Sequence, residues 1–231
     1  MRDRLKRPTF ATFTPAFYWS CTYLLRFLLT IFVRWRVRGR ANVPATGALV
    51  VVSNHVSNTD PPVLGAGIGS RRIRYMAKIE LFSYPGGVIP RLWGAFPVRR
   101  FEADMAALLN AERLLKRGEV LGMFPEGTRS RGGGMGKPHP GTALIALRSG
   151  APVLPCAVIG TEQLTSPFRI LRRPPVAVLI GKPITVTQVR RPSEAQITEL
   201  TAQMVAAIGA LIPPAYRAAY TGDDGGNSPG V

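Results

Sequence analysis

The feature that most constrains the fold is a series of short apolar runs, rich in β-branched residues, that alternate with longer segments of helical periodicity. This alternation is typical of an α/β domain. From Val37 onward we therefore predict a mixed, largely parallel central sheet flanked by helices. The predicted strands are Leu49–Ser53, Ile73–Ala77, Val120–Phe124, Val153–Val158 and Val176–Ile180.

Two of the longer segments predict helices. The first spans Glu102–Arg117, with acidic residues in its first turn and cationic residues at its end, which suits the helix dipole. We expect its inner face to carry Met105, Leu108, Leu109 and Leu115. The second begins at Ser193, where Gln196 completes a capping box. We expect its inner face to carry Ile197, Leu200, Met204, Ile208 and Leu211.

An apolar stretch, Phe17–Val33, precedes the domain and has basic residues on both flanks. A helix of roughly 17 residues measures about 26 Å, against about 30 Å for the hydrocarbon core of a bilayer. Arg26 lies near its middle, where it is costly in a spanning helix but can reach the headgroups from a helix lying in the interface. We favour an interfacial or re-entrant anchor, and a true span, a buried helix and a signal peptide remain alternatives.

The chain of 231 residues is long enough for one domain with a substantial core. We predict a membrane-associating segment over 1–36, the α/β domain over 37–213 and a tail over 214–231. From Gly222 the tail is too polar to repay its ordering entropy, so we expect disorder there. Cys21 and Cys156 are expected to be reduced packing residues, and no spacing suggests a metal site.

The formal net charge of +17 predicts an anionic partner. Nucleic acid, an anionic membrane face and a phosphorylated substrate all fit that charge. The basic residues are scattered around apolar and glycine-rich blocks, without a recognition helix or an aromatic stacking platform. A nucleic-acid-binding module is therefore disfavoured, and a membrane surface with a phosphorylated substrate is preferred.

The candidate catalytic residues are His55 and Asp60, in a polar loop that directly follows the predicted strand Leu49–Ser53. Open α/β sheets place reactive groups at such strand ends. Residues five apart lie about 140° apart on a regular helix, so a pair between them requires a loop or a helix entrance. There the Asp60 carboxylate could fix the imidazole tautomer and leave the other ring nitrogen as a base. The spacing alone is also compatible with a structural histidine.

Two further polar blocks follow predicted apolar runs. After Phe124 come Pro125, Glu126, Gly127, Thr128, Arg129 and Ser130; after a short apolar run come Arg99 and Arg100. Gly127 allows close approach to a ligand, and arginine suits a phosphate group. Glu126 could orient Arg129 or accept a hydrogen bond from a substrate hydroxyl.

With these blocks in place, the chain resembles the 1-acylglycerol-3-phosphate (lysophosphatidic acid) acyltransferases. That family carries an Asn-His-x4-Asp block and a Phe-Pro-Glu-Gly-Thr-Arg-Ser block, and both stand here in full, at Asn54–Asp60 and Phe124–Ser130. Gly94–Arg100 resembles the family's phosphate-contacting block and Ala151–Pro155 its proline-bracketed block. The resemblance covers roughly Val37 to Thr187.

The resemblance implies transfer of a fatty acyl group from acyl-coenzyme A or acyl carrier protein to the free hydroxyl of 1-acylglycerol-3-phosphate, giving phosphatidic acid in phospholipid biosynthesis. It makes His55 the general base and Asp60 the carboxylate that orients it. It assigns substrate binding to Arg99, Arg100, Glu126, Gly127, Thr128 and Arg129. It implies no metal or resident cofactor, and a place on the cell membrane, peripheral or monotopic, with the active site facing the cytoplasm. A different lysophospholipid or lipid alcohol as acceptor, and a non-enzymatic basic membrane- or nucleic-acid-binding protein, remain alternatives.

Two departures from the family pattern stand out. Arg99 directly precedes Arg100 where relatives often carry an acidic or neutral residue, so either arginine could meet the phosphate. The second is the glycine-rich loop Arg131–Gly136 with the residues that follow it. We interpret His139 as a surface-loop residue rather than a catalytic one, and Lys137 could add to the positive field around the phosphate.

Overall fold

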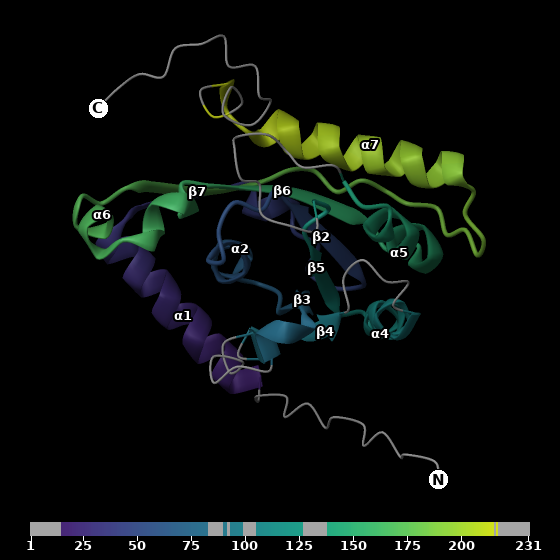
Figure 1. The fold of residues 1–231 in the computed structure, drawn as a ribbon, viewed down its shortest axis with the longest axis horizontal. Helices are drawn as coiled ribbons and strands as arrows, with labels where there is room; N and C mark the ends of the chain where they lie inside the picture. The colour runs from purple at the N-terminus through teal and green to yellow at the C-terminus, as the bar shows by residue number, and fades with distance from the viewer. Residues whose placement is uncertain are drawn as a thin grey trace.

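The computed structural model describes residues 15–82, 90–91, 93–98, 105–126, 138–214 and 216. Seven strands form one sheet in the order β1-β7-β6-β2-β5-β3-β4 (Figure 1). The strands are β1 (Arg34–Arg38), β2 (Leu49–Ser53), β3 (Ile73–Lys78), β4 (Phe96–Val98), β5 (Val120–Met123), β6 (Val153–Ile159) and β7 (Pro175–Ile180). The helices are α1 (Pro15–Phe32), α2 (Asp60–Ile68), α4 (Met105–Lys116), α5 (Gly141–Ser149), α6 (Pro167–Leu171) and α7 (Glu194–Leu211). Short 3-10 turns are η1 (Arg40–Asn42), η2 (Ile79–Phe82) and η4 (Thr161–Thr165).

The strand directions bring the ends of five strands to one edge of the sheet. β2 pairs in parallel with β5 and β6, and β3 pairs in parallel with β5 and β4. β6 and β7 are antiparallel, and β1 is parallel to β7. The carboxyl ends of β2, β3, β4, β5 and β6 therefore meet at the same edge, which we call the carboxyl edge. The opposite edge, where these five strands begin, is the amino edge.

Helices cover both faces of the sheet. Helices α1 and α2 lie on one face, while α4, α5 and α7 lie on the other (Figure 1). Every residue of β2 is buried. Its side chains alternate between the two hydrophobic clusters, with Val50 and Val52 in one and Leu49 and Val51 in the other. This central position explains why β2 reads as a continuous apolar run.

The predicted α/β fold and its mixed, largely parallel sheet are confirmed, and all five predicted strands are present. Strands β1 and β4 were not predicted. The sequence of β1, Arg-Trp-Arg-Val-Arg, hides a strand because β1 lies at the sheet edge, and its three arginines alternate toward solvent. Helix α2 was missed as well, because Pro61 and Pro62 open it and glycines interrupt its apolar pattern.

The helix predicted over Glu102–Arg117 is α4, but its predicted inner face was wrong in part. Met105 is 56% exposed and Leu109 is 38% exposed. The buried face carries Ala107, Ala111, Leu114 and Leu115. Alanines at the contact allow the helix to approach the sheet closely, so small residues rather than the larger apolar ones face the core. Helix α7, by contrast, forms with the predicted capping box, and Leu200, Met204 and Ile208 are buried.

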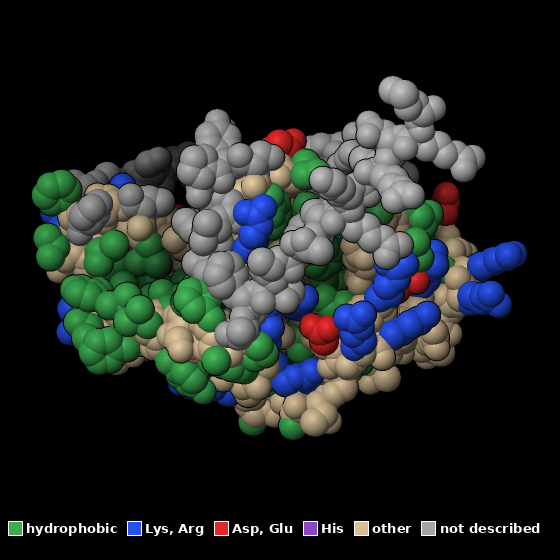
Figure 2. Space-filling model, turned by 90° about the horizontal axis from the view of Figure 1, so that it is seen from below, with side chains coloured by type: hydrophobic (Ala, Val, Ile, Leu, Met, Phe, Trp, Pro, Cys, Tyr) green, Lys and Arg blue, Asp and Glu red, His purple; other side chains and the backbone are tan. Residues whose placement is uncertain are grey.

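Helix α1 is apolar on two sides. Its inner stripe packs on the domain through Tyr18, Thr22, Leu25, Leu29 and the adjoining Val33. Its outer side exposes Phe17, Tyr23, Leu24, Phe27, Leu28, Ile31 and Phe32. Figure 2 shows apolar side chains gathered on the left, the side on which α1 lies in Figure 1. Among the described residues, no helix has both the length and the apolar character needed to cross a membrane.

Helix α1 lies before the predicted start of the domain at residue 37, and most of the predicted tail lies beyond the described residues. The sheet begins at Arg34 with β1, and residues 217–231 of the predicted tail lie outside the described part, so the domain limits stay predictions. Both cysteines are free thiols; Cys21 is partly buried, and Cys156 is buried in β6. Burial raises the pKa of the Cys156 thiol, which keeps it protonated and a poor nucleophile.

Candidate active site

His55 and Asp60 lie at the carboxyl edge: His55 is in the loop that joins β2 to α2, and Asp60 is the first residue of α2. The His55 Nδ1 atom and the Asp60 Oδ2 atom are 2.9 Å apart. The pair is possible because Asp60 opens helix α2, the helix entrance that the five-residue spacing requires. Asp60 is fully buried, whereas His55 is 9% exposed. The imidazole thus keeps access to the surface, and with Nδ1 held by Asp60, Nε2 is the nitrogen that can act as a base.

The Asp60 carboxylate is oriented by four donors. Besides His55, its Oδ2 atom accepts hydrogen bonds from the backbone N–H groups of Val56 at 2.7 Å and Ser57 at 2.8 Å. Its Oδ1 atom accepts a hydrogen bond from the Thr161 hydroxyl. With both oxygens engaged in the fully buried site, the carboxylate cannot rotate away from the imidazole.

Thr161 is a site residue that sequence reasoning missed. It lies 101 positions beyond Asp60 and reaches it because β6 ends beside β2 at the carboxyl edge. Gly160 turns the chain there with φ of 83°, and a side chain on Gly160 would collide with the carbonyl of Pro175. Only glycine fits this left-handed position. The Gly-Thr pair directly after an apolar strand was the available signal.

Two neighbours fix the backbone that carries His55. The Asn54 amide bridges to β6, donating to the Val158 carbonyl and accepting from the Val158 N–H, each at 2.8 Å. On the other side, Glu126 Oε1 accepts from the His55 N–H at 3.3 Å. Glu126 is only 2% exposed. It therefore fastens the strand end after β5 to the loop after β2.

Aromatic packing sets the plane of the imidazole. The His55 ring stacks on Phe124 with ring centroids 4.3 Å apart and an interplanar angle of 24°. Phe124 in turn stacks on Tyr75 of β3. The Tyr75 hydroxyl donates to the Pro61 carbonyl at 2.8 Å. Burial raises the pKa of Tyr75 well above its ordinary value, so it stays a neutral donor and supports the stack rather than the chemistry.

Five predicted substrate-binding residues lie outside the described part of the chain: Arg99, Arg100, Gly127, Thr128 and Arg129. The described residues that precede these two blocks lie at the carboxyl edge, because β4 ends there at Val98 and Glu126 contacts the His55 loop. Lys137 also lies outside the described part. His139 is exposed, and its backbone N–H donates to the Pro125 carbonyl at 2.7 Å.

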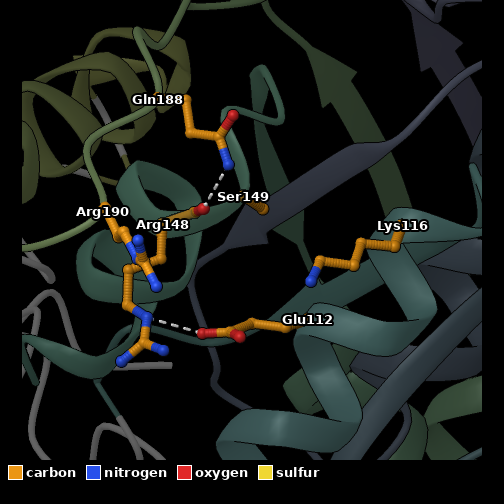
Figure 3. Close-up of a pocket in the computed structure, with 6 residues that line it drawn as sticks. All are labelled: Glu112, Lys116, Arg148, Ser149, Gln188 and Arg190. Carbon is orange, nitrogen blue, oxygen red and sulfur yellow. Dashed lines mark hydrogen bonds and ion pairs between the residues drawn. The ribbon is translucent and has the colours of Figure 1, made fainter.

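The amino edge has a cavity of about 490 Å³ between the ends of α4 and α5 (Figure 3). Its walls are Glu112, Lys116, Arg148, Ser149, Gln188 and Arg190. The Arg148 Nε atom pairs with Glu112 at 2.6 Å, and Gln188 donates to the Arg148 carbonyl at 3.0 Å. Of the predicted site residues that the structure describes, namely His55, Asp60 and Glu126, none lines this cavity. Among the described residues no group of three or more His, Cys, Asp or Glu side chains could hold a metal ion.

The fold and the site together define an α/β protein that presents a histidine, oriented by a buried carboxylate, at the carboxyl edge of its sheet. The family model described as Acyltransferase matches residues 34–159, which include the whole His55–Asp60 loop and Glu126. The chain belongs to this acyltransferase family, as its motifs predicted.

Named relatives agree with that assignment. A 1-acyl-sn-glycerol-3-phosphate acyltransferase of Bacillus subtilis is 31% identical over 169 residues, covering 72% of this chain and 82% of that one. A chloroplastic enzyme of the same name from Brassica napus is 32% identical over 159 residues, but the match spans only 46% of its length. The crystal structure of the 1-acyl-sn-glycerophosphate acyltransferase PlsC from Thermotoga maritima superposes with a TM-score of 0.59 at 28% identity, covering 92% of this chain and 86% of that one.

Proposed function

We propose that the protein transfers a fatty acyl group from acyl-coenzyme A or acyl carrier protein to the free hydroxyl of 1-acylglycerol-3-phosphate, giving phosphatidic acid for phospholipid biosynthesis. The observation that carries the proposal is the buried His55–Asp60 pair in a member of the acyltransferase family. The names of the Bacillus subtilis and Thermotoga maritima relatives support this acceptor.

In the proposed mechanism, His55 Nε2 takes the proton of the acceptor hydroxyl while that oxygen attacks the thioester carbonyl. The Asp60 carboxylate stabilises the imidazolium through Nδ1–H. Collapse of the tetrahedral intermediate forms the new ester, breaks the C–S bond and expels a thiolate, which takes the proton back from His55. A positioned general base contributes about 10² to 10⁴-fold, so orientation of the two substrates must supply much of the remaining acceleration.

The acceptor phosphate is the proposed handle for that orientation. Arg129 and either Arg99 or Arg100 would hold it, with Gly127 and Thr128 close by, because guanidinium groups match phosphate geometry. Two described features support this assignment: β4 ends at Val98 on the carboxyl edge, and Glu126 already contacts the His55 loop. Both blocks would thus deliver cations to the edge that carries the base. Glu126 then serves to hold the His55 loop.

The proposed acceptor and product are membrane lipids, so we propose that the protein lies on the cytoplasmic face of the cell membrane. The outer side of α1 supports this, since Leu24, Phe27, Leu28 and Ile31 follow a helical spacing and all are exposed. The charge of +17 favours anionic lipids. Helix α1 would lie flat, with its inner stripe on the domain and its outer side among acyl chains.

The test is to incubate the purified protein and vesicles with acyl-coenzyme A or acyl carrier protein as donor, and to identify the products by mass. The acceptors are lysophosphatidate, a second lysophospholipid and a monoacylglycerol, which lacks the phosphate. We expect phosphatidic acid from lysophosphatidate as the fastest product. Acylation confined to acceptors without phosphate would contradict the proposal.

A matched pair of arginine variants tests the phosphate handle. Arg129→Gln should raise KM for lysophosphatidate about tenfold or more, as a charge-assisted contact is lost, and leave monoacylglycerol turnover unchanged. The control is Arg190→Gln, an equal charge change on the amino edge. If both variants raise KM alike, the effect is one of net charge and the handle is misassigned.

A further inference from the structure

A second exposed apolar surface lies on α6, the short helix that follows η4 between β6 and β7. Phe168 is 80% exposed and Leu171 is 76% exposed, more than any other exposed large apolar side chain in the described part of the chain. The two residues are three positions apart on the helix and therefore share one side of it. Together with Arg169 and Arg172, which are also exposed, they form what we call the α6 patch. Exposed aromatic and aliphatic side chains in such a group mark an interaction site.

The patch is held in place against α1. Arg173, two positions beyond the end of α6, donates from Nη2 to the carbonyl of Thr30 in α1 at 3.3 Å. Arg173 has φ of 49° and is the sole described non-glycine residue with positive φ. Such a conformation is sparsely populated, so the surroundings must maintain it. The turn therefore fixes α6 beside the carboxyl-terminal part of α1, on the left in Figure 1.

The position of α6 relates the patch to the site. The chain leaves β6 at Ile159, passes Thr161 at the Asp60 carboxylate and enters α6 six residues later. The patch thus belongs to the carboxyl edge, as does His55. A ligand that covers both α1 and the patch would lie along the side of the molecule that borders the base.

The charges beside the apolar side chains select the kind of ligand. Arg169 directly follows Phe168 in α6, and Arg172, the residue after the helix, directly follows Leu171, so each exposed apolar side chain has a cationic neighbour. Arginine at the boundary between acyl chains and headgroups can bury its stem and meet a lipid phosphate. A protein partner would need acidic and apolar groups at matching positions. An anionic bilayer presents lipid phosphates and acyl chains over its whole surface, so it can meet the patch in any orientation of the helix.

We propose that the α6 patch is a second membrane-contacting element, which inserts Phe168 and Leu171 into an anionic bilayer while Arg169 and Arg172 contact lipid phosphates. Two separate contacts, the outer side of α1 and the α6 patch, fix the rotation of the domain on the membrane. The carboxyl edge then faces the bilayer surface from which the acceptor comes. The inference rests on the proposed function in two respects: the acceptor is a membrane lipid, and the outer side of α1 contacts the membrane.

The test measures binding of the full-length protein to vesicles by sedimentation, without substrates, so its outcome does not depend on which reaction is catalysed. The variant is Phe168→Ser with Leu171→Ser, and the matched control is Met105→Ser with Leu109→Ser on α4, where both apolar side chains are exposed on the opposite face of the sheet. Vesicles are phosphatidylcholine alone and phosphatidylcholine with phosphatidylglycerol. Urea unfolding of each variant checks that the fold is retained.

We expect the α6 variant to lower the partition coefficient about tenfold or more on both kinds of vesicle, and the control to leave it within about twofold of wild type. Arg169→Gln with Arg172→Gln should lower binding to the anionic vesicles alone. The proposal is overturned if wild type does not bind vesicles, if the α6 variant binds as wild type does, or if the α4 control weakens binding equally.

Discussion

The two edges of the sheet carry polar groups of similar kinds but use them differently. At the carboxyl edge, a buried carboxylate collects four donors, one of which is an imidazole that remains accessible. At the amino edge, Arg71 donates to the carbonyls of Pro44 at 2.9 Å, Gly47 at 2.6 Å and Gly118 at 2.9 Å. It ties together the loops that precede β2, β3 and β5.

The two polar networks differ in whether they include a group that can exchange a proton with a substrate. At the amino edge the acceptors are carbonyls and the donor is a guanidinium that does not lose its proton, so the network can only hold loops together. At the carboxyl edge the network ends on the His55 imidazole, whose second ring nitrogen can accept a hydrogen bond or a proton from a substrate. Changes at the carboxyl edge should therefore affect turnover, and changes at the amino edge should affect stability.

The largest effect is expected from Asp60→Asn. The amide can keep contacts to the loop N–H groups but loses the negative charge that stabilises the imidazolium, so kcat should fall about 10² to 10⁴-fold. The urea concentration at the unfolding midpoint should change little, so the loss of kcat would not be due to unfolding. A variant with kcat within a few-fold of wild type would mean that Asp60 is structural only.

Arg71→Ala, at the amino edge, should lower stability and leave turnover almost unchanged. Losing three hydrogen bonds from a charged donor that is partly exposed should lower the free energy of unfolding by about 1–3 kcal/mol, with kcat of the folded enzyme nearly unchanged. Denaturant titration and initial rates measure the two quantities. Arg71→Lys should recover only part of the stability, because an ammonium group lacks the fork that reaches several carbonyls.

Thr161→Val should lower kcat about tenfold, because it removes one of the donors that orient Asp60 and leaves a buried carboxylate oxygen without it. Thr161→Ser keeps the hydroxyl and should restore most of the rate at equal or lower stability. If the serine and valine variants are equally slow, the loss comes from packing and not from the hydrogen bond.

The smallest effect is expected in the amino-edge cavity. Glu112→Gln weakens the ion pair with Arg148, which is partly exposed, and should change the free energy of unfolding by about 1 kcal/mol or less and kcat not at all. Rates and urea midpoints measured beside those of Asp60→Asn would complete the comparison. A large drop in kcat would connect this cavity to the chemistry and break the contrast between the edges.

Much of this contrast could be predicted from sequence. The strands that position the site are buried and apolar, so Leu49–Ser53 and Val120–Phe124 could be located, and with them His55 and Glu126. Strand β1 could not be predicted, because it lies at the edge of the sheet and its three arginines hide the apolar pattern of a strand. Thr161 could not be assigned because its partner is distant in sequence and depends on the order of the strands. The inner face of α4 was misjudged because close packing favoured Ala107 and Ala111 over Met105 and Leu109.

The central claim is that His55 is the base in acyl transfer to a lipid hydroxyl. The most direct measurement is turnover of lysophosphatidate with acyl-coenzyme A by His55→Ala, with the product quantified by mass and the fold checked by urea unfolding. We expect a loss of about 10² to 10⁴-fold or more in a folded protein that still binds vesicles. Full turnover by the folded His55→Ala variant would contradict it.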